Sequence, residues 1–374
     1  MNEQVMPLQA LPRKKSGQRA VFPMLAGMAL GALCGWPIGL LMKAHGRFHV
    51  SPWIILMLPV VLLLGLAWHE AGHVVAGLVG GFDFRLVVAG PLRLERHDGR
   101  LKVSFNRIPV LWGGLAGCVP KSYEADLRWK MILFAGGGPL FSLLGAALLV
   151  PGFSVLTAHA DAGLLLITFG LSSAALGIVT LLPLPAGGFK TDGMRLVMLL
   201  RRRPEGERWT ALAALGGLAQ TARPREWPAE LMTLLGDGLD AQGDAAMACL
   251  VWYLWHSDKR EWEPAQMWLE RALTHAKDMP RSTLPILYLA AANYYARHSS
   301  DKALARQYFD LAQGPGLQDP NDMHAVRAAV LIAEGRAAEA RLDIDLAEQK
   351  LRLKPPAVAQ WMREDIDELR ARIG

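Results

Sequence analysis

Hydrophobic and charged positions divide the chain into an apolar first half and a polar second half. Residues 20–42, 131–150 and 162–182 contain no Asp, Glu, Lys or Arg, and residues 53–81 contain Glu70 alone. A helix needs about 20 apolar residues to cross the hydrocarbon core of a bilayer. The sequence therefore predicts a mainly α-helical protein whose first half is a polytopic membrane bundle of about four spans.

The basic residues between these runs predict how the chain is oriented. Lys and Arg are concentrated in residues 1–19, 85–130 and 190–203, whereas residues 43–52 contain only two and residues 151–161 none. Positively charged loops remain on the cytoplasmic side of a membrane. We therefore expect a multi-pass protein of a bacterial inner membrane, with residues 1–19 and both termini in the cytoplasm.

A short segment between the second and third runs alternates apolar and polar residues. Leu92, Leu94, Leu101 and Val103 recur at every second position on either side of Asp98-Gly99. This alternation is typical of strands, and Asp-Gly favours a tight turn. We predict a small β-hairpin over residues 84–106. It is either a plain surface hairpin or an edge that pairs with an extended peptide, in which case these four apolar side chains contact substrate.

The polar half contains no further run of membrane length and predicts alternating helices and breaks. One spacing, i, i+4 and i+7, recurs in it at intervals of 40 and 35 residues. The residues concerned are Ala265, Leu269 and Ala272, then Ala305, Phe309 and Ala312, then Ala340, Ile344 and Ala347. The pattern resembles the second helix of tetratricopeptide (TPR) repeats, whose period is about 34 residues. We predict a linker over residues 204–240 and a cytoplasmic TPR-like helical domain over residues 241–374 that binds a cytoplasmic protein. A generic helical bundle is the alternative.

Composition excludes several classes of protein. Hydrophobic residues make up 52% of the chain and charged residues 20%, with a formal net charge of +6. Such a chain is neither disordered nor collagen-like. Its three cysteines, Cys34, Cys118 and Cys249, lie far apart, which excludes a disulfide-stapled secreted module. We expect no nucleic-acid partner, and the sequence leaves the oligomeric state open.

The second apolar run contains the motif His69-Glu70-Ala71-Gly72-His73. On a helix, residues four apart differ by about 40° in direction, so both imidazoles leave the same face one turn apart. Two such imidazoles suit a tetrahedral Zn²⁺ ion, and Glu70, beside them, is placed to accept a proton from water. Ionisable groups inside a membrane are costly, which favours a functional site over a structural polar cluster or an ion path.

Elimination points to a third zinc ligand. Between Arg128 and Gly193 the only acidic residues are Asp161 and Asp192. Asp161 lies in a predicted external loop, and the other histidines lie in the two external loops, in the hairpin turn or in the polar half. Asp192 follows the last span on the cytoplasmic side, where the second span ends. We predict that it completes the zinc site, although Asp-Gly is also a common turn sequence.

Several segments together resemble the site-2 protease family, the membrane-embedded zinc metalloproteases. The likeness covers about residues 50–200. It rests on the His69–His73 motif, on Gly138-Pro139-Leu140-Phe141-Ser142, on Leu182-Pro183-Leu184-Pro185 followed by Asp192-Gly193, and more weakly on Gly113-Gly114-Leu115. Ser142 and Thr180 stand where the family has asparagines that contact substrate.

The resemblance implies an intramembrane zinc metalloendopeptidase that cuts single-span membrane proteins in or near their transmembrane segments. His69, His73 and Asp192 would hold Zn²⁺, Glu70 would be the general base, and Ser142 and Thr180 would partly replace the substrate-binding asparagines. The main alternative is an inactive membrane scaffold that presents the helical tail. A protease of the prenylated-protein type needs a glutamate ligand on a later helix, and the spans after residue 131 contain none. A transporter would place polar groups on several spans.

Overall fold

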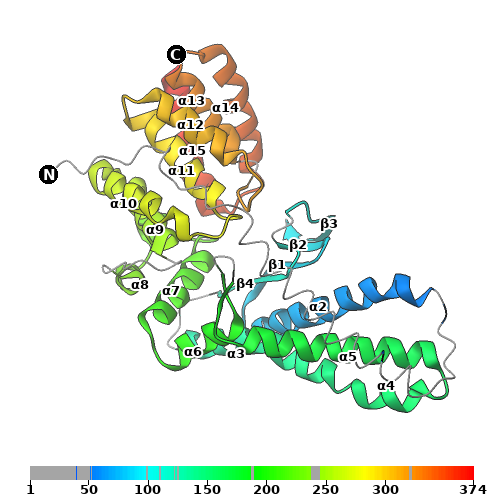
Figure 1. Ribbon diagram of the computed structural model, residues 1–374. Helices are drawn as coiled ribbons and strands as arrows, with labels where there is room; N and C mark the ends of the chain where they lie inside the picture. Colours follow the sequence, from blue (N-terminus) through cyan, green and yellow to red (C-terminus); the bar gives the residue numbers. More distant parts are fainter. Residues whose placement is uncertain are drawn as a thin grey trace. The chain divides into compact units, whose positions relative to one another are not determined.

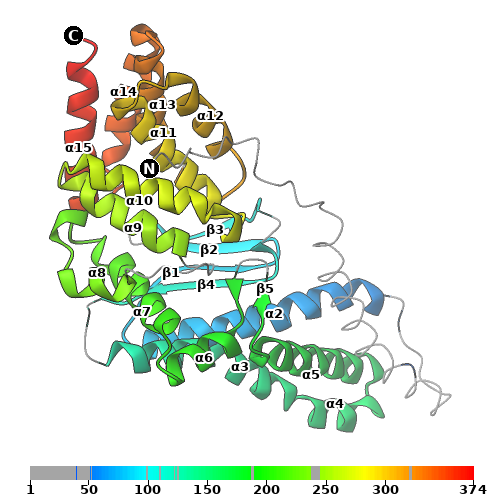
Figure 2. The same ribbon diagram turned by 60° about the vertical axis from the view of Figure 1, so that its left-hand side comes forward.

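The computed structural model describes residue 39, residue 51 and residues 53–374, except 98–99, 109–110, 122, 124–125, 187–188, 237–244 and 320–321. The chain forms two compact units (Figures 1 and 2). The first consists of Met1–Cys118 and Arg128–Arg201, and the second of Val119–Leu127 and Arg202–Gly374. The chain therefore enters the second unit briefly before returning to complete the first.

The first unit is built on apolar helices. These are α2 (Ile54–Val79), α3 (Leu127–Ala146), α4 (Leu149–Leu156) and α5 (Ala160–Leu181), followed by the shorter α6 (Asp192–Leu200). Three helical segments, Leu56–Val79, Leu127–Leu156 and Ala160–Leu181, are long and apolar enough to cross a membrane. They match the second, third and fourth predicted spans. Apart from residue 39, the first predicted span, residues 20–42, lies outside the described residues.

Small residues allow α2, α3 and α5 to approach one another closely. A Cβ atom on Gly72 of α2 would lie 2.4 Å from the carbonyl oxygen of Gly137 on α3, and one on Gly177 of α5 would lie 2.9 Å from the Cβ of Ser142. Membrane helices associate through such small-residue contacts, because lipid supplies no hydrophobic drive between them. The glycines of these helices thus bring the polar residues of α2 and α3 together.

A four-stranded antiparallel sheet follows α2. It comprises β1 (Asp83–Ala89), β2 (Leu92–His97), β3 (Arg100–Phe105) and β4 (Leu115–Val119), in the order β3-β2-β1-β4. The predicted hairpin is present as β2 and β3, in which Leu94 pairs with Val103 and His97 with Arg100. The prediction missed β1 and β4, so the element is a sheet rather than an isolated hairpin, and β3 forms one of its edges.

The second unit is helical, and most of its helices follow one another in pairs. Residues 204–240, predicted as a linker, contain α7 (Pro204–Leu218) and α8 (Ala229–Leu235). Three pairs come next, and within each pair the two helices pack on each other. They are α9 (Ala245–Asp258) with α10 (Trp262–Thr274), α11 (Leu284–His298) with α12 (Lys302–Ala312), and α13 (Asp322–Ala333) with α14 (Ala337–Leu351); α15 (Pro356–Ala371) ends the unit.

The repeated spacing in the sequence falls on the second helix of each pair. All nine residues of the three triplets, on α10, α12 and α14, are buried. Alanine at the first and last positions keeps those positions small, which suits close packing of each second helix on its neighbours. The periodic pattern therefore marks real helix pairs, while their membership of the TPR class stays a prediction.

Candidate metal centre

Three buried polar side chains of the first unit meet in one place. His69 and His73 lie one turn apart on α2, and Asp192 lies in the first turn of α6. Their exposed fractions are 2%, 5% and 8%, respectively. The structure thus brings together the three residues that the sequence suggested as metal ligands, although 119 positions separate the second histidine from the aspartate.

The spacing of their donor atoms suits a metal ion. His69 Nε2 and His73 Nε2 lie 3.3 Å apart. Asp192 Oδ2 lies 3.3 Å from the first nitrogen and 3.4 Å from the second. Metal–ligand bonds of about 2.0–2.1 Å in a tetrahedral site place the ligand atoms about 3.3–3.4 Å apart. The three atoms therefore form a nearly equilateral triangle of the right size, and this group could hold a metal ion.

Hydrogen bonds on the far side of each imidazole direct its Nε2 inward. His73 Nδ1 donates to the carbonyl oxygen of Phe134 at 2.7 Å, and His69 Nδ1 lies 2.8 Å from Ser142 Oγ. A ring nitrogen that donates a proton leaves the lone pair on the other nitrogen, so the bond to Phe134 makes Nε2 of His73 available to a metal. Ser142 is fully buried. Its hydroxyl is therefore in place to orient the His69 imidazole, and its contact with substrate stays a prediction.

The glycine of the Gly138–Ser142 segment lies directly against the donor atoms. A Cβ at Gly138 would lie 2.2 Å from His73 Nε2 and 2.7 Å from His69 Nε2. Because Gly138 and Ser142 are one helical turn apart on α3, both face the histidines. This segment, noted in the sequence for its likeness to a family motif, therefore lines the candidate site at both of its ends.

Thr191 holds the start of α6, where Asp192 lies. Its Oγ1 donates to the carbonyl oxygen of Leu182 at 2.6 Å and accepts a hydrogen bond from the backbone N–H of Met194. This is an N-cap, which satisfies a backbone donor of the first helical turn. The turn is further held by β5 (Pro185–Ala186) and β6 (Phe189–Lys190), which pair with each other. Backbone pairing thus holds Ala186 against Phe189 and Pro185 against Lys190.

Gly193 lets this turn approach the end of α5. A Cβ there would lie 1.8 Å from the carbonyl oxygen of Leu181. The other end of α6 is tied to α3, because Arg128 Nη1 donates to the carbonyl oxygen of Leu199 at 3.3 Å.

Burial raises the pKa of Asp192, but its hydrogen bonds with His69 and His73 outweigh burial and hold that pKa below its usual value. A lowered pKa favours the charged carboxylate, which is the form that binds a metal ion.

Glu70 is buried, with an exposed fraction of 7%, beside the loop that follows β3. Gly114 of this loop has a φ of +102°, and a Cβ on it would lie 2.2 Å from Glu70 Oε1. Only glycine adopts that backbone readily and leaves space for the carboxylate. The weak Gly113-Gly114-Leu115 match thus lies against the predicted base.

Sequence reasoning missed Asn106, which organises the same loop. This residue is 1% exposed. Its Nδ2 donates to the carbonyl oxygens of Gly90 and Ile108 at 3.2 and 3.3 Å, and its Oδ1 accepts from the Ile108 N–H at 3.0 Å. An asparagine after a strand is unremarkable in a sequence, and only these contacts reveal that it fixes the path toward Gly114.

The remaining predicted substrate contacts do not join the three ligands. Thr180 Oγ1 donates to the carbonyl oxygen of Gly177, within α5. On the sheet, Leu92, Leu101 and Val103 are 59%, 62% and 70% exposed, whereas Leu94 is half-buried. These residues form an open apolar face on β2 and the edge strand β3.

Comparison with known proteins identifies no relative: no protein-family model, curated protein or solved structure matches this chain.

Proposed function

We propose that this protein is an intramembrane zinc metalloprotease that hydrolyses peptide bonds in or near transmembrane segments of membrane proteins. The observation that carries the proposal is the buried triangle of His69 Nε2, His73 Nε2 and Asp192 Oδ2, with edges of 3.3–3.4 Å, beside a buried glutamate. Catalytic zinc sites use three protein ligands and keep a fourth position open. Two imidazoles and one carboxylate are a donor set that zinc accepts.

The chemistry is divided between the metal and Glu70. Zinc bound by these residues would lower the pKa of a water molecule and polarise the scissile carbonyl. Glu70 accepts the proton from the attacking water and returns it to the leaving amine. Gly114 leaves room for the carboxylate of Glu70, while Phe134 and Ser142 keep the two imidazoles oriented.

The substrate must present an extended backbone to this centre. A helical segment hides its carbonyls in hydrogen bonds, so a single-span protein has to unwind locally before it is cut. The edge strand β3 offers unpaired backbone groups to such a segment. Its exposed Leu101 and Val103 supply apolar contacts. The substrate class that we propose is therefore single-span membrane proteins.

A glutamine substitution at Glu70 tests the proposal. The purified wild-type chain should bind one zinc ion and cut a single-span test protein in detergent or liposomes. Glu70→Gln removes the base and keeps the shape, so cleavage should fall at least about 100-fold, with zinc content unchanged. The exposed Glu230→Gln, in α8, is the matched control and should cut like wild type.

Two results would contradict the proposal. Unchanged cleavage by Glu70→Gln would reject the assigned base. A wild-type chain that binds zinc stoichiometrically but cuts none of a panel of single-span proteins would favour the scaffold alternative.

A further inference from the structure

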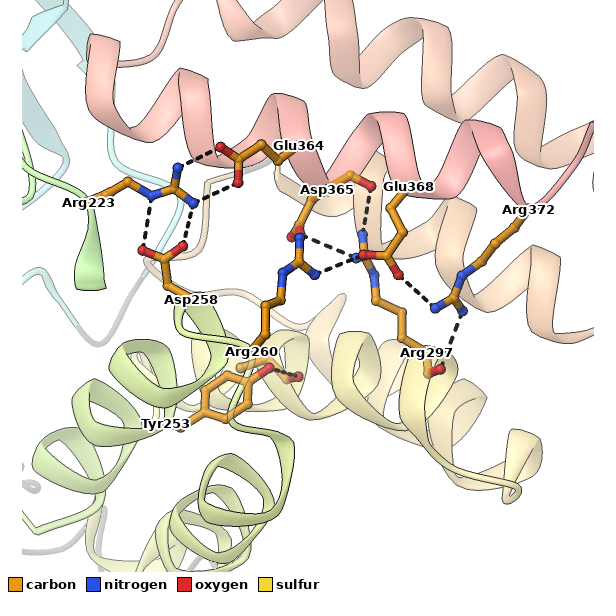
Figure 3. A network of polar contacts seen from close by, with 10 residues as sticks. Arg223, Tyr253, Asp258, Arg260, Arg297, Glu364, Asp365, Glu368 and Arg372 are labelled. Atoms are coloured by element: carbon orange, nitrogen blue, oxygen red, sulfur yellow. Dashed lines mark hydrogen bonds and ion pairs between the residues drawn. The ribbon is translucent and has the colours of Figure 1, made fainter. Parts of the chain in front are cut away.

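Three arginines of the second unit gather where α9 and α11 end. Arg223 precedes the short 3-10 helix Pro224–Glu226, Arg260 lies in the turn after α9, and Arg297 is in the last turn of α11. All three point toward α15 in Figure 3. We call Arg223, Arg260 and Arg297 the arginine cluster.

One face of α15 supplies the acidic partners of this cluster. Glu364 and Glu368 are four residues apart, and Asp365 and Glu368 are three apart, so Glu368 has a neighbouring acid on either side along the helix surface. Both terminal nitrogens of Arg223 bind the Glu364 carboxylate, at 2.6 and 2.8 Å. Arg260 Nη1 lies 2.9 Å from Glu368 Oε2. Such charge-assisted pairs fix the position and direction of a helix.

Arg297 adds further contacts to the same helix. Its Nη1 lies 3.3 Å from Asp365 Oδ1, and its Nη2 donates to the backbone carbonyl of that residue at 3.1 Å. The Arg297 side chain is 3% exposed, and its Nε makes no hydrogen bond to any described residue. A buried guanidinium with an unused donor has capacity for another acceptor.

Two members of the arginine cluster have features that do not involve α15. Arg223 is 2% exposed, and Asp258, at the end of α9, accepts hydrogen bonds from its Nε and Nη2. Arg260 has a φ of +63°, a left-handed conformation that arginine seldom adopts. A costly backbone conformation that is nevertheless kept suggests a role for the side chain that it directs.

The attachment of α15 depends strongly on charge. Of its 16 residues only Ile366 and Leu369 are buried, whereas α11 has eight buried residues in 15. A helix with so little buried apolar surface is released more easily than a core helix. If α15 were removed, Arg223 would still bind Asp258, while the contacts of the cluster with Glu364, Asp365 and Glu368 would be lost. The vacated surface would then be strongly basic.

We propose that the arginine cluster is a docking site for an acidic amphipathic helix of a partner protein, and that α15 is its exchangeable occupant within the chain. The partner helix would carry carboxylates at i and i+4, in the places of Glu364 and Glu368. When it binds, it displaces α15 and exposes the acidic face of that helix. This inference does not depend on the chemistry at His69.

A peptide binding experiment with the full chain tests the inference. The probe is a fluorescent peptide of residues 354–374. Glu364→Lys/Glu368→Lys in the full chain should release α15, so this variant should bind the peptide at least about tenfold more tightly than wild type. Binding should weaken as salt is raised, because the contacts are ionic. Asp367→Lys, on the exposed side of α15, should behave like wild type.

A second peptide decides the role of charge. A peptide that itself carries the two lysines should not bind the released site. The proposal is overturned if the double variant binds neither peptide, or if it binds both equally well. Hydrogen exchange of α9–α14 should show native protection in the double variant.

A cleavable chain keeps the test decisive if the double variant unfolds. A protease site inserted between Arg352 and Leu353, in the otherwise unaltered chain, allows α15 to be cut free after folding. The cut helix should stay bound in low salt, dissociate in high salt and be displaced by excess acidic peptide. Retention under all these conditions would show that α15 is a permanent part of the fold and would refute exchange.

Discussion

Two glycines each leave space for a different part of the candidate site. Gly138 faces the histidine nitrogens, and Gly114 faces the carboxylate of Glu70. A methyl group at either position therefore probes a separate function, metal binding in the first case and proton transfer in the second. Each glycine has a neighbouring glycine whose Cβ would meet nothing within 4 Å, namely Gly136 and Gly113.

Gly138→Ala should abolish zinc binding. Its Cβ would lie 2.2 Å from His73 Nε2, so the imidazoles must move and the triangle opens. Loss of a hydrogen bond that supports a metal ligand lowers metal affinity roughly 10- to 100-fold. We expect zinc affinity to fall by more than that in Gly138→Ala. Zinc stoichiometry and competition with a chelator measure this, and Gly136→Ala is the control. Normal zinc content in Gly138→Ala would show that the metal lies elsewhere.

Gly114→Ala should leave zinc in place and impair proteolysis. The added methyl group would lie 2.2 Å from Glu70 Oε1, and the φ of +102° disfavours alanine. Misplacing a general base costs about 100-fold or more in rate. Cleavage assays of Gly114→Ala beside Gly113→Ala, at equal zinc content, measure the effect. Equal activities of the two variants would remove Gly114 from the site.

The sequence predicts the ligands better than their supports. His69 and His73 follow from helical period, and Asp192 from the scarcity of acids after Arg128. The roles of Ser142 and Asn106 arise from contacts between segments distant in sequence. Serine and asparagine are ordinary residues at such places, so no local pattern distinguishes them.

At the scale of elements, long apolar runs were the strongest signal. Three of the four predicted spans are helices long enough to cross a membrane. An apolar run of about 20 residues is typical of a membrane-spanning helix, so this signal is easy to read from the sequence. β1 and β4 escaped prediction. Asp83–Ala89 begins three residues after α2 and combines charged residues with a short apolar run, and the short Leu115–Val119 lacks alternation. α7 and α8 were read as linker because their apolar residues do not form a long run.

The cap of α6 should control the metal site. Thr191→Val keeps the shape of the side chain and removes the hydroxyl that bonds Leu182 and Met194. Loss of an N-cap costs about 1 kcal/mol, and here it frees the turn that carries Asp192. We expect zinc affinity to fall about 5-fold or more, since 1.4 kcal/mol is tenfold in an equilibrium constant. Isothermal titration should measure this, with Thr191→Ser as the conservative control; equal affinities for Val and Ser would contradict the role.

At the scale of the whole molecule, the two units are joined at three places. The chain passes between them after Cys118, after Leu127 and after Arg201. Within the second unit, a Cβ on Gly217 of α7 would lie 2.0 Å from the carbonyl oxygen of Pro120. Pro120, in the short segment that belongs to the second unit, is thus packed against α7.

A single cut between the units should therefore leave them associated. The arginines at 201–203 are exposed, so a protease site inserted after Arg202 can be cleaved in the folded chain. The fragments should copurify without denaturant. Gly217→Ala, which crowds Pro120, should loosen them, whereas Gly216→Ala, 4.0 Å from its nearest neighbour, should not. Prompt separation of the unsubstituted fragments would contradict this arrangement.

The same arrangement imposes an order on biosynthesis. Val119–Leu127 leaves the ribosome well before Arg202–Gly374, the rest of the unit to which it belongs. Chains are made from the N-terminus, and domains normally fold as units as they emerge. Val119–Leu127 therefore remains without the rest of its unit while α3, α5 and α6 are synthesised. The half that carries the candidate metal centre therefore emerges before Val119–Leu127 has its packing partners, and translation of the C-terminal half supplies them.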